Sequence, residues 1–274
     1  TAIYGIAEGK NRIIWLSTDE GLGYFDKTKE KFFYINNHFL RKNVFKKDLC
    51  VDDSGRVWLF NQKLKFVVYD PIKDSIVIKI PDYSEWGVEE GFYITHFLVV
   101  NDNIWFSSNK GIGMYDYKKK KVTIIDKKAN NHCHNIRRVN DRTLTMTYMN
   151  EGVYVVDIYM RESVFFTKKL IESAVGIKTA LFDAVLEADS TLWVSASPGM
   201  VSIKNDDIKY YSYDSRQNYF SGDVVSSLFC DKDQNLWIGT YGDGIFLKKK
   251  NNSKFKFSTR LHKGDIKKTH ISSF

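Results

Sequence analysis

Leu236-Trp237-Ile238-Gly239-Thr240 is the last of a series of similar phrases, each with a tryptophan between aliphatic residues and small residues after them. The earlier copies are centred on Trp15, Trp58, Trp105 and Trp193. A degenerate copy, Leu144-Thr145-Met146-Thr147, has Thr145 where the tryptophan would stand. The copies recur at intervals of about 40 to 50 residues, which is the period of repeat architectures built from small supersecondary units.

The last complete unit contains four short apolar segments separated by polar turns. Residues 224–230 precede the tryptophan segment, and a glycine-rich hairpin at 241–244 leads from it to Ile245-Phe246-Leu247. An alternating segment at 254–258 completes the unit. β-Branched and aromatic residues bounded by Gly, Asn and Asp clusters predict antiparallel strands.

A single four-stranded sheet cannot bury both of its apolar faces, so we expect the sheets to stack side by side as propeller blades. The predicted fold is an all-β β-propeller of four-stranded antiparallel blades, with six repeats and the first strand of a further blade. This points to part of a seven-bladed or longer array, and whether six blades close alone stays open. We expect one domain over 1–274, with units at about 1–43, 44–92, 93–134, 135–178, 179–222 and 223–265, and a new blade starting at 266–274.

The units resemble the repeats of the two-component-regulator propeller family. That pattern is D-x-x-G/N-x-[LI]-W-[IVL]-[GS]-[TS]-x-x-G-[LI]-x-x-[YF]-[DN], and residues 233–246, 11–26 and 103–116 match it well. The unit at Trp58 lacks the hairpin glycine, and the unit at Thr145 lacks the tryptophan. The resemblance extends over nearly the whole chain.

The resemblance implies the periplasmic sensor region of a hybrid two-component histidine kinase from glycan-degrading gut bacteria. In such proteins propellers precede a β-sandwich, a membrane helix and a kinase. It also implies an oligosaccharide ligand, a neighbouring propeller or sandwich domain, a homodimer in the full-length protein, and no direct membrane contact of this segment.

Composition adds a basic balance, with 41 Lys and Arg against 33 Asp and Glu and a net charge of +8. This favours acidic partners in general. We expect no nucleic-acid partner, because no Arg-rich helix or nucleic-acid motif is present. The lysine runs at 118–121 and 248–250 fit solvated turns, and no segment has the roughly 20 apolar residues of a membrane span.

Several local patterns resemble sites of chemistry but fit structural roles better. The recurring Gly-x-Gly fits a hairpin better than a phosphate loop. Residues 231–235 and 52–55 fit strand turns better than calcium loops, and His132-Cys133-His134 fits a loop better than a metal site. Cys50, Cys133 and Cys230 fit buried thiols. We expect no catalytic residues, metal or cofactor, and therefore no enzyme.

The connections between units are long and differ from one another, at 36–43, 81–93, 127–135, 167–177 and 214–223. In a propeller they share one rim with the hairpins that follow the tryptophan strands. Aromatic rings stack on sugars, and Arg and Asn bind hydroxyl or carboxylate groups, so recognition is expected on this rim. The candidate ligand contacts are Trp86, Tyr83, Arg41, His38, Asn109, Arg216, Tyr219, Tyr241 and Asp243.

The leading hypothesis is a non-catalytic sensor propeller that recognises an oligosaccharide, with an acidic one favoured, or relays its recognition to regulate polysaccharide use. One alternative is a rigid protein-docking scaffold without its own sugar site. Another is a propeller lyase or lactonase.

Overall fold

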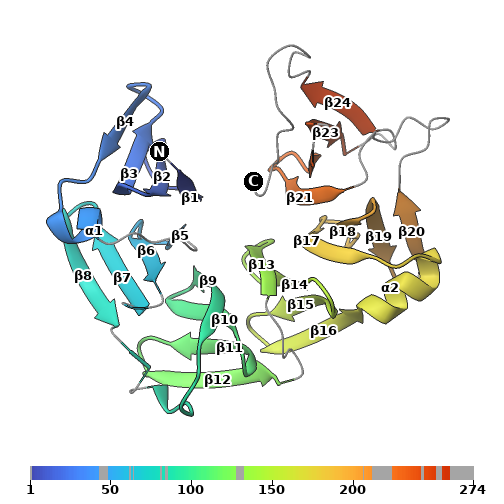
Figure 1. Cartoon of the computed structure of the whole chain (residues 1–274), viewed down its shortest axis with the longest axis horizontal. Helices are drawn as coiled ribbons and strands as arrows, with labels where there is room; N and C mark the ends of the chain where they lie inside the picture. Colours follow the sequence, from blue (N-terminus) through green and yellow to red (C-terminus); the bar gives the residue numbers. More distant parts are fainter. Residues whose placement is uncertain are drawn as a thin grey trace. The chain divides into compact units, whose positions relative to one another are not determined.

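The computed structural model describes residues 2–42, 49–61, 63, 65–80, 82–83, 86–127, 133–205, 207–211, 224–241, 244–250 and 255–259, without the side chains of 42 and 255–259. Within these ranges the chain forms six four-stranded antiparallel sheets, in which each strand pairs with the next one along the chain (Figure 1). This confirms the predicted all-β fold of four-stranded propeller blades. The predicted further blade at 266–274 lies outside the described residues.

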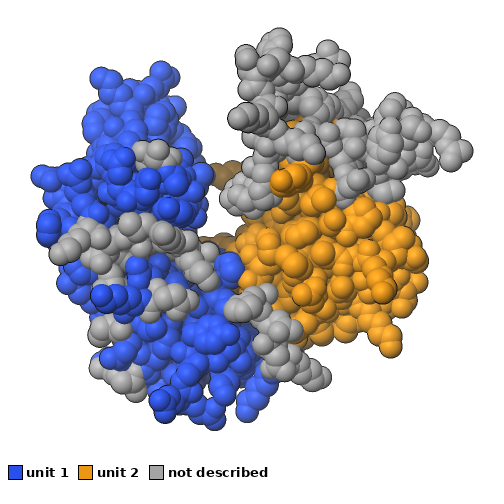
Figure 2. Space-filling view, in the orientation of Figure 1, with its two compact units in different colours: residues 1–127 blue, residues 128–274 orange. Residues whose placement is uncertain are grey.

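The chain divides into two compact units, Thr1–Lys127 and Lys128–Phe274 (Figure 2). Unit 1 contains blade 1, made of β1 Ile3–Glu8, β2 Ile13–Thr18, β3 Gly21–Asp26 and β4 Lys31–Tyr34. Its blade 2 comprises β5 Leu49–Val51, β6 Val57–Asn61, β7 Lys65–Asp70 and β8 Ser75–Ile80. Its blade 3 comprises β9 Ile94–Val100, β10 Asn103–Ser108, β11 Gly111–Asp116 and β12 Lys121–Asp126.

Unit 2 contains three further blades. Blade 4 comprises β13 Cys133–Arg138, β14 Thr143–Tyr148, β15 Gly152–Asp157 and β16 Glu162–Thr167. Blade 5 comprises β17 Ala180–Leu186, β18 Leu192–Ser197, β19 Met200–Lys204 and β20 Asp207–Tyr211. Blade 6 comprises β21 Val225–Cys230, β22 Leu236–Thr240, β23 Ile245–Lys248 and β24 Phe255–Thr259. In each unit the first, inner strands of successive blades lie next to one another.

The repeated tryptophan has a polar partner as well as a packing role. In blade 2 the Trp58 indole Nε1 donates to Asp52 Oδ2 at 2.8 Å, and in blade 6 Trp237 Nε1 donates to Asp231 Oδ2 at 2.8 Å. Each aspartate also accepts backbone N–H groups of its own turn, such as that of Arg56 on Asp52. The six-residue spacing from Asp to Trp therefore ties the turn to the second strand, as expected for a structural turn.

The small residue that ends the second strand organises the following hairpin. Thr18 Oγ1 donates to Gly21 O at 3.0 Å, and Ser108 Oγ donates to Gly111 O at 2.9 Å. Gly111 has φ +108°, and a Cβ there would lie 1.9 Å from the carbonyl oxygen of Asp126. Glycine is required because this position combines positive φ with close backbone approach, which confirms the hairpin interpretation of Gly-x-Gly.

The aspartate that ends the third strand forms an Asx turn before the fourth. Asp116 Oδ1 accepts the backbone N–H groups of Lys119 and Lys118 at 2.9 and 3.1 Å. These bonds, chiefly that from Lys119, hold the pKa of Asp116 below its ordinary value. The same turn follows Asp26, Asp70 and Asp157.

A β-bulge interrupts the pairing of inner strands with second strands in blades 1, 3, 4, 5 and 6. Polar groups near the bulges form hydrogen bonds with the neighbouring strand. Thr95 Oγ1 donates to Ser107 O at 3.2 Å, and the backbone N–H of Asp183 donates to Ser195 Oγ at 2.8 Å. A bulge changes the direction in which nearby side chains point. The bulge of β17 lies between Leu181 and Ala184 and therefore includes Asp183.

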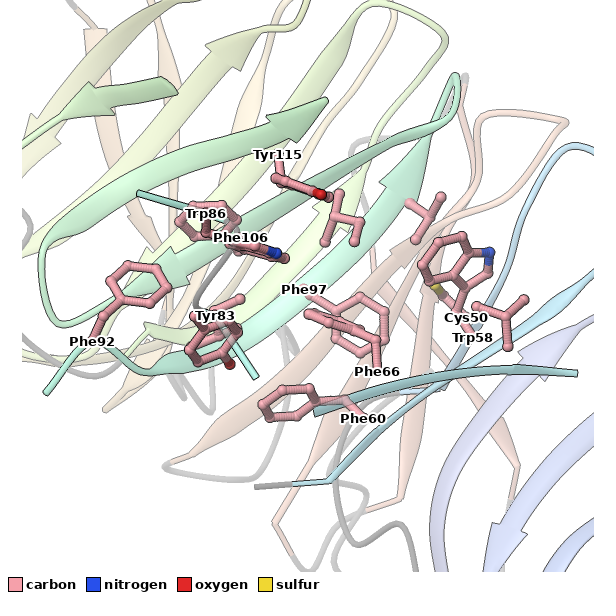
Figure 3. Close-up of a cluster of buried hydrophobic side chains, with 14 residues drawn as sticks. Cys50, Trp58, Phe60, Phe66, Tyr83, Trp86, Phe92, Phe97, Phe106 and Tyr115 are labelled. Carbon is pink, nitrogen blue, oxygen red and sulfur yellow. The ribbon is translucent and has the colours of Figure 1, made fainter. Parts of the chain in front are cut away.

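Hydrophobic clusters fill the spaces between neighbouring blades within each unit. In unit 1 the largest contains an aromatic stack, in which the Trp86 ring is parallel to Tyr115, with centroids 4.1 Å apart, and nearly parallel to Phe66 at 6.0 Å (Figure 3). In unit 2, Trp193 packs in a cluster shared by blades 5 and 6. These side chains are buried because neighbouring blades pack side by side, as predicted.

Two connections expected to be loops contain helices. α1 (His38–Lys42) begins after Asn37, whose Oδ1 accepts the N–H groups of Phe39 and Leu40. α2 (Lys168–Val175) has Thr167 as its N-cap and Gly176, in the left-handed conformation, as its C-cap. The Thr167 and Gly176 caps are recognisable sequence signals for a helix. Ile171 of α2 is buried in a hydrophobic cluster with residues of blades 4 and 5.

Candidate functional site

The predicted rim contacts of unit 1 fall into two groups. His38 and Arg41 are exposed on the short helix α1. Asn109 lies in the β10–β11 hairpin, where its Nδ2 donates to Gly91 O at 2.9 Å and its Oδ1 accepts from Tyr93 N at 3.0 Å. Asn109 thus joins its hairpin to the 81–93 connection, and its amide is occupied by protein.

Trp86 and Tyr83 lie in the core of unit 1. Trp86 is 4% exposed, and Tyr115 and Phe66 each stack on it (Figure 3). Tyr83 is 9% exposed and packs against Trp86 at 5.0 Å between ring centroids. A ring buried between two others has no open face for a sugar, so in this arrangement both residues act through packing.

The predicted contacts of unit 2 are described only in part. Tyr241 follows β22 and is 52% exposed, with its backbone N–H donating to Val224 O at 3.0 Å. Arg216, Tyr219 and Asp243 lie outside the described residues. The rim assignment as a whole stays a prediction, with His38, Arg41 and Tyr241 as its exposed members.

Unit 2 also contains a pocket of about 280 Å³ that the sequence did not predict. It is lined by residues 137–139, 185–186, 229–232 and Gln234. These are the C-terminal ends of the inner strands β13, β17 and β21 and the turn after β21. The predicted rim lies at the N-terminal ends of the inner strands, so the pocket and the rim are at opposite ends of the blades.

One wall of the pocket is formed by a guanidinium that a buried carboxylate holds in place. Arg137 Nη2 lies 2.8 Å from Asp183 Oδ2, and Arg137 Nε lies 3.4 Å from Oδ1. Asp183 also accepts from Asn135 Nδ2 at 2.7 Å and from the backbone N–H of Leu228 at 2.9 Å. Its side chain is 2% exposed. The carboxylate therefore joins the inner strands of blades 4, 5 and 6.

Two further cations and one carboxylate surround the pocket. Arg138 Nη2 pairs at 2.8 Å with Asp141, whose side chain is almost fully exposed, and Lys232 is exposed with no ion-pair partner among the described residues. Asp231 accepts from Asn235 and Trp237. Partial burial opposes its ionisation, but the bonds from Trp237 and Asn235 outweigh this and lower the pKa of Asp231. The lining thus contains three cations and one anion, and the anion is saturated by protein donors.

The rest of the lining is apolar. Phe229 is 40% exposed although it belongs to an inner strand, and Val139, Val185 and Leu186 lie near it in the lining. Burial, followed by the nearby charges of Glu187 and Asp231, raises the pKa of the Cys230 thiol to about 11. Cys230 is therefore a neutral thiol at pH 7 and not a thiolate nucleophile. The arrangement suits binding of an anionic group beside an apolar ring.

Other sequence-level candidates have structural surroundings. His134 Nδ1 lies 3.0 Å from Phe182 O, and His132 lies outside the described residues. No group of His, Cys, Asp or Glu suited to a metal ion occurs in the described part of the chain. Neither helix α1 nor α2, among the residues described, has the length and hydropathy of a bilayer crossing. The three cysteines are free, and Cys50 and Cys133 are buried as expected.

One lysine expected in a solvated turn is instead partly buried. Lys248 ends β23, pairs with Glu187 Oε1 at 3.1 Å, and lies over the Trp193 ring at 5.2 Å. Lys118 and Lys119 do occupy an exposed turn, where they pair with Asp102 and Asp116. Both lysine runs therefore contain residues that form ion pairs with carboxylates of the protein.

The pocket residues are not identified from the sequence, because the segment before each tryptophan strand is expected to be apolar and to serve packing. In the inner strands of unit 2, three charged residues break that pattern: Arg137 and Arg138 at the end of β13, and Asp183 within β17. A charged residue in a strand that lines the inner edge of a blade is a signal of a paired or ligand-binding group, and it was available in the sequence.

Comparison with known proteins supports the same fold. The profile of the family described as "Two component regulator propeller" matches residues 219–242. No curated protein matches the chain. Among solved structures, the extracellular domain of the putative one component system BT4673 from B. thetaiotaomicron is 15% identical with a TM-score of 0.66, over 90% of this chain and 32% of that one.

Two other solved structures give similar scores. The extracellular domain of the putative hybrid two component system BT3049 from B. thetaiotaomicron is 16% identical, with a TM-score of 0.63 over 96% of this chain and 35% of that one. Saccharomyces cerevisiae Sqt1 is 10% identical, with a TM-score of 0.65 over 95% of this chain and 75% of that one. At these identities the likeness concerns the fold.

The chain spans about a third of the length of the two bacterial extracellular domains. The profile match includes the blade 6 tryptophan segment, which belongs to one of the stretches that fit the family's repeat pattern. The chain therefore contains a repeat of the two-component regulator propeller family, set in an array of four-stranded propeller blades.

Proposed function

We propose that this chain is a non-catalytic sensing propeller in the periplasmic, extracytoplasmic part of a hybrid two-component signalling protein. Its role is to recognise an oligosaccharide, or to relay that recognition, so that polysaccharide use is regulated. A histidine kinase elsewhere in the full-length protein would receive the signal. A neighbouring propeller or sandwich domain and a second copy of the protein would be its partners.

Two lines of reasoning support this proposal. The family match concerns a two-component regulator repeat, and the bacterial structures of similar fold are extracellular domains of putative one component and hybrid two component systems. The rigid blades provide a scaffold on which exposed groups can be held in fixed positions for recognition.

The single observation that favours ligand recognition over passive docking is the pocket of unit 2. It combines an exposed aromatic ring, Phe229, with the cations Arg137, Arg138 and Lys232 in about 280 Å³. Sugar sites use this combination, because aromatic faces contact C–H groups while cations and amides bind hydroxyl and acidic groups.

Signalling requires that the ligand bind two arrangements of the protein with different affinity, since a ligand with equal affinity for both shifts nothing. Unit 2 offers a place where this difference could arise, because the pocket is formed by inner strands of three blades. Occupancy would favour the arrangement in which those strand ends are correctly spaced around the ligand.

The experiment is isothermal titration calorimetry of the purified chain, and then of the whole extracytoplasmic region, against neutral and acidic oligosaccharides. Saturable heat with at least one sugar is the expected result. Absence of heat with every sugar for both proteins would favour the docking-scaffold alternative. Turnover of a sugar by the purified chain, measured as product formed, would favour the lyase or lactonase alternative.

The same titrations locate the sugar on the protein. Tyr241→Ala and Arg41→Ala test the rim, and Phe229→Ala tests the pocket. All three side chains are exposed, so the variants should fold. Trp86→Ala is unsuitable for this purpose, because removal of a buried tryptophan costs about 3 to 5 kcal/mol of stability whatever the ligand does.

A further inference from the structure

We propose that the pocket at the C-terminal ends of β13, β17 and β21 is a subsite for a single acidic sugar residue, one that bears a carboxylate or a sulfate ester. Arg137 is the anchoring cation, and Phe229 contacts the sugar ring. This inference rests on the proposed function, since it names the class of sugar and the place where it binds.

The size of the pocket limits the ligand to about one ring. Its volume of about 280 Å³ is just below the roughly 300 to 1,000 Å³ that small-molecule sites occupy. One pyranose ring with its charged substituent is compatible with this volume, and several linked rings are not. The remaining residues of an oligosaccharide would extend out of the pocket.

Arg137 is arranged to bind an anion and still keep its partner. Its bonds to Asp183 use two of the five N–H donors of a guanidinium, so three remain for other acceptors. The side chain is 16% exposed and lines the pocket. Because Asp183 fixes the guanidinium in advance, little conformational entropy is lost when a ligand binds.

The cations around the pocket favour an anionic group on the ligand. Arg137, Arg138 and Lys232 face the lining carboxylate Asp231 and the buried carboxylate Asp183 beneath Arg137. Both carboxylates are saturated by protein donors and cannot bind a further cation without loss of those bonds. Arg138 is paired with the exposed Asp141, so Lys232 and the remaining N–H donors of Arg137 are the positive groups left for the carboxylate or sulfate of a sugar.

Phe229 supplies the apolar contact. Phe229 is 40% exposed, whereas Leu228 next to it is buried. A partly exposed aromatic side chain in the same lining as a guanidinium suits a sugar ring that has an apolar C–H surface and a charged substituent. A free inorganic anion would use the cations but would gain nothing from Phe229.

The test is calorimetry of the full chain with digalacturonate, with its methyl ester, and with a disaccharide that carries one sulfate. The methyl ester keeps the size of the ligand and removes its charge. The account predicts binding of digalacturonate or the sulfated disaccharide, with binding of the methyl ester at least about 10-fold weaker. It also predicts weaker binding at higher salt.

Variants separate this pocket from other parts of the surface. Lys232→Gln changes an exposed residue and should weaken acidic-sugar binding about 3- to 10-fold, and Phe229→Ala should weaken it comparably. Arg137→Lys keeps the positive charge but loses the two-point hydrogen bonding of the guanidinium to Asp183. It should weaken acidic-sugar binding more than either of these variants does. The matched control is Lys204→Gln, which removes another unit 2 lysine paired with Asp189 outside the pocket.

Equal binding of the methyl ester and the free acid would overturn the inference, as would equal effects of Lys232→Gln and Lys204→Gln. In either case sugar binding itself would persist, and the proposed sensing function would stand with another site. Failure of all sugars to bind would instead remove the proposed function. Preference for the sulfated disaccharide over digalacturonate, with the same variant effects, would support the subsite and assign it to sulfate.

Discussion

Arg137 Nη2 on β13 lies 2.8 Å from Asp183 Oδ2 on β17, so an ion pair joins the inner strands of two neighbouring blades. The same carboxylate accepts the backbone N–H of Leu228 on β21. One buried side chain therefore connects three blades of unit 2 and also orients the guanidinium that lines the pocket. Stability and ligand recognition share this residue.

Asp183→Ala should destabilise the protein by about 3 to 5 kcal/mol, because it leaves a mostly buried guanidinium and a buried N–H group without their acceptor. Urea unfolding followed by tryptophan fluorescence measures the change. Asp207→Ala is the matched control, since Asp207 pairs with Lys209 in an exposed position where such pairs are worth about 0 to 1 kcal/mol. Equal losses of unfolding free energy in the two variants would show that the buried network contributes no more to stability than an exposed ion pair.

Trp58→Phe should cost about 1 to 3 kcal/mol beyond its packing loss, because Asp52 loses the indole donor at 2.8 Å. Trp105→Phe is the control for packing. Both tryptophans are nearly fully buried, but the residue six positions before Trp105 is Val99 and not an aspartate. A double-mutant cycle with Asp52→Ala should give a coupling energy for Trp58, and a coupling near zero would refute the proposed link between turn and strand.

Gly111→Ala should lower stability by about 2 to 4 kcal/mol, because the new Cβ would lie 1.9 Å from the Asp126 carbonyl oxygen at a positive φ. Gly87→Ala is the control. Gly87 also has positive φ, but nothing described lies within 4 Å of a Cβ there, so only the backbone cost of about 1 to 2 kcal/mol applies. Thermal unfolding compares the two, and similar shifts would contradict the close-approach argument.

Stability should fall as the pH drops below 4, and Asp189 should contribute to this fall. The hydrogen bond from Lys204 and then that from Thr191 lower the pKa of Asp189 to about 2. A carboxyl with a depressed folded pKa stabilises the fold above its unfolded pKa and loses that contribution as the pH falls through the folded value. Unfolding at pH 6, 4, 3 and 2 should therefore show Asp189→Asn less stable than the parent at pH 6, with the gap closing toward pH 2. Lys204→Gln should show the same pH dependence. A stability difference between parent and variant that stays constant from pH 6 to pH 2 would contradict the lowered pKa of Asp189.

The tryptophan period was sufficient to predict the blades. The fourth strand expected at 254–258 corresponds to β24 Phe255–Thr259. Each short strand is bounded by turn residues whose hydrogen bonds are local, such as the Asx turn of Asp116. Local chemistry of this kind is readable from sequence, because the partners are only a few residues apart.

The positions that sequence did not determine depend on partners far along the chain. Trp86 is expected on the rim because it lies in the 81–93 connection, but Tyr115 and Phe66 cover it. Asp183 and Arg137 are 46 residues apart and meet only when two blades pack together. A single sequence gives the residue types at both places and does not give the packing that buries one aromatic and exposes another, Phe229.

The most direct measurement is a crystal structure of the chain with digalacturonate or the singly sulfated disaccharide, whichever binds in solution. The account predicts electron density for one acidic sugar ring in the unit 2 pocket, with its charged group within hydrogen-bond distance of Arg137 and its ring against Phe229. Density for the sugar at the opposite, rim end of the blades, with the pocket empty, would contradict it.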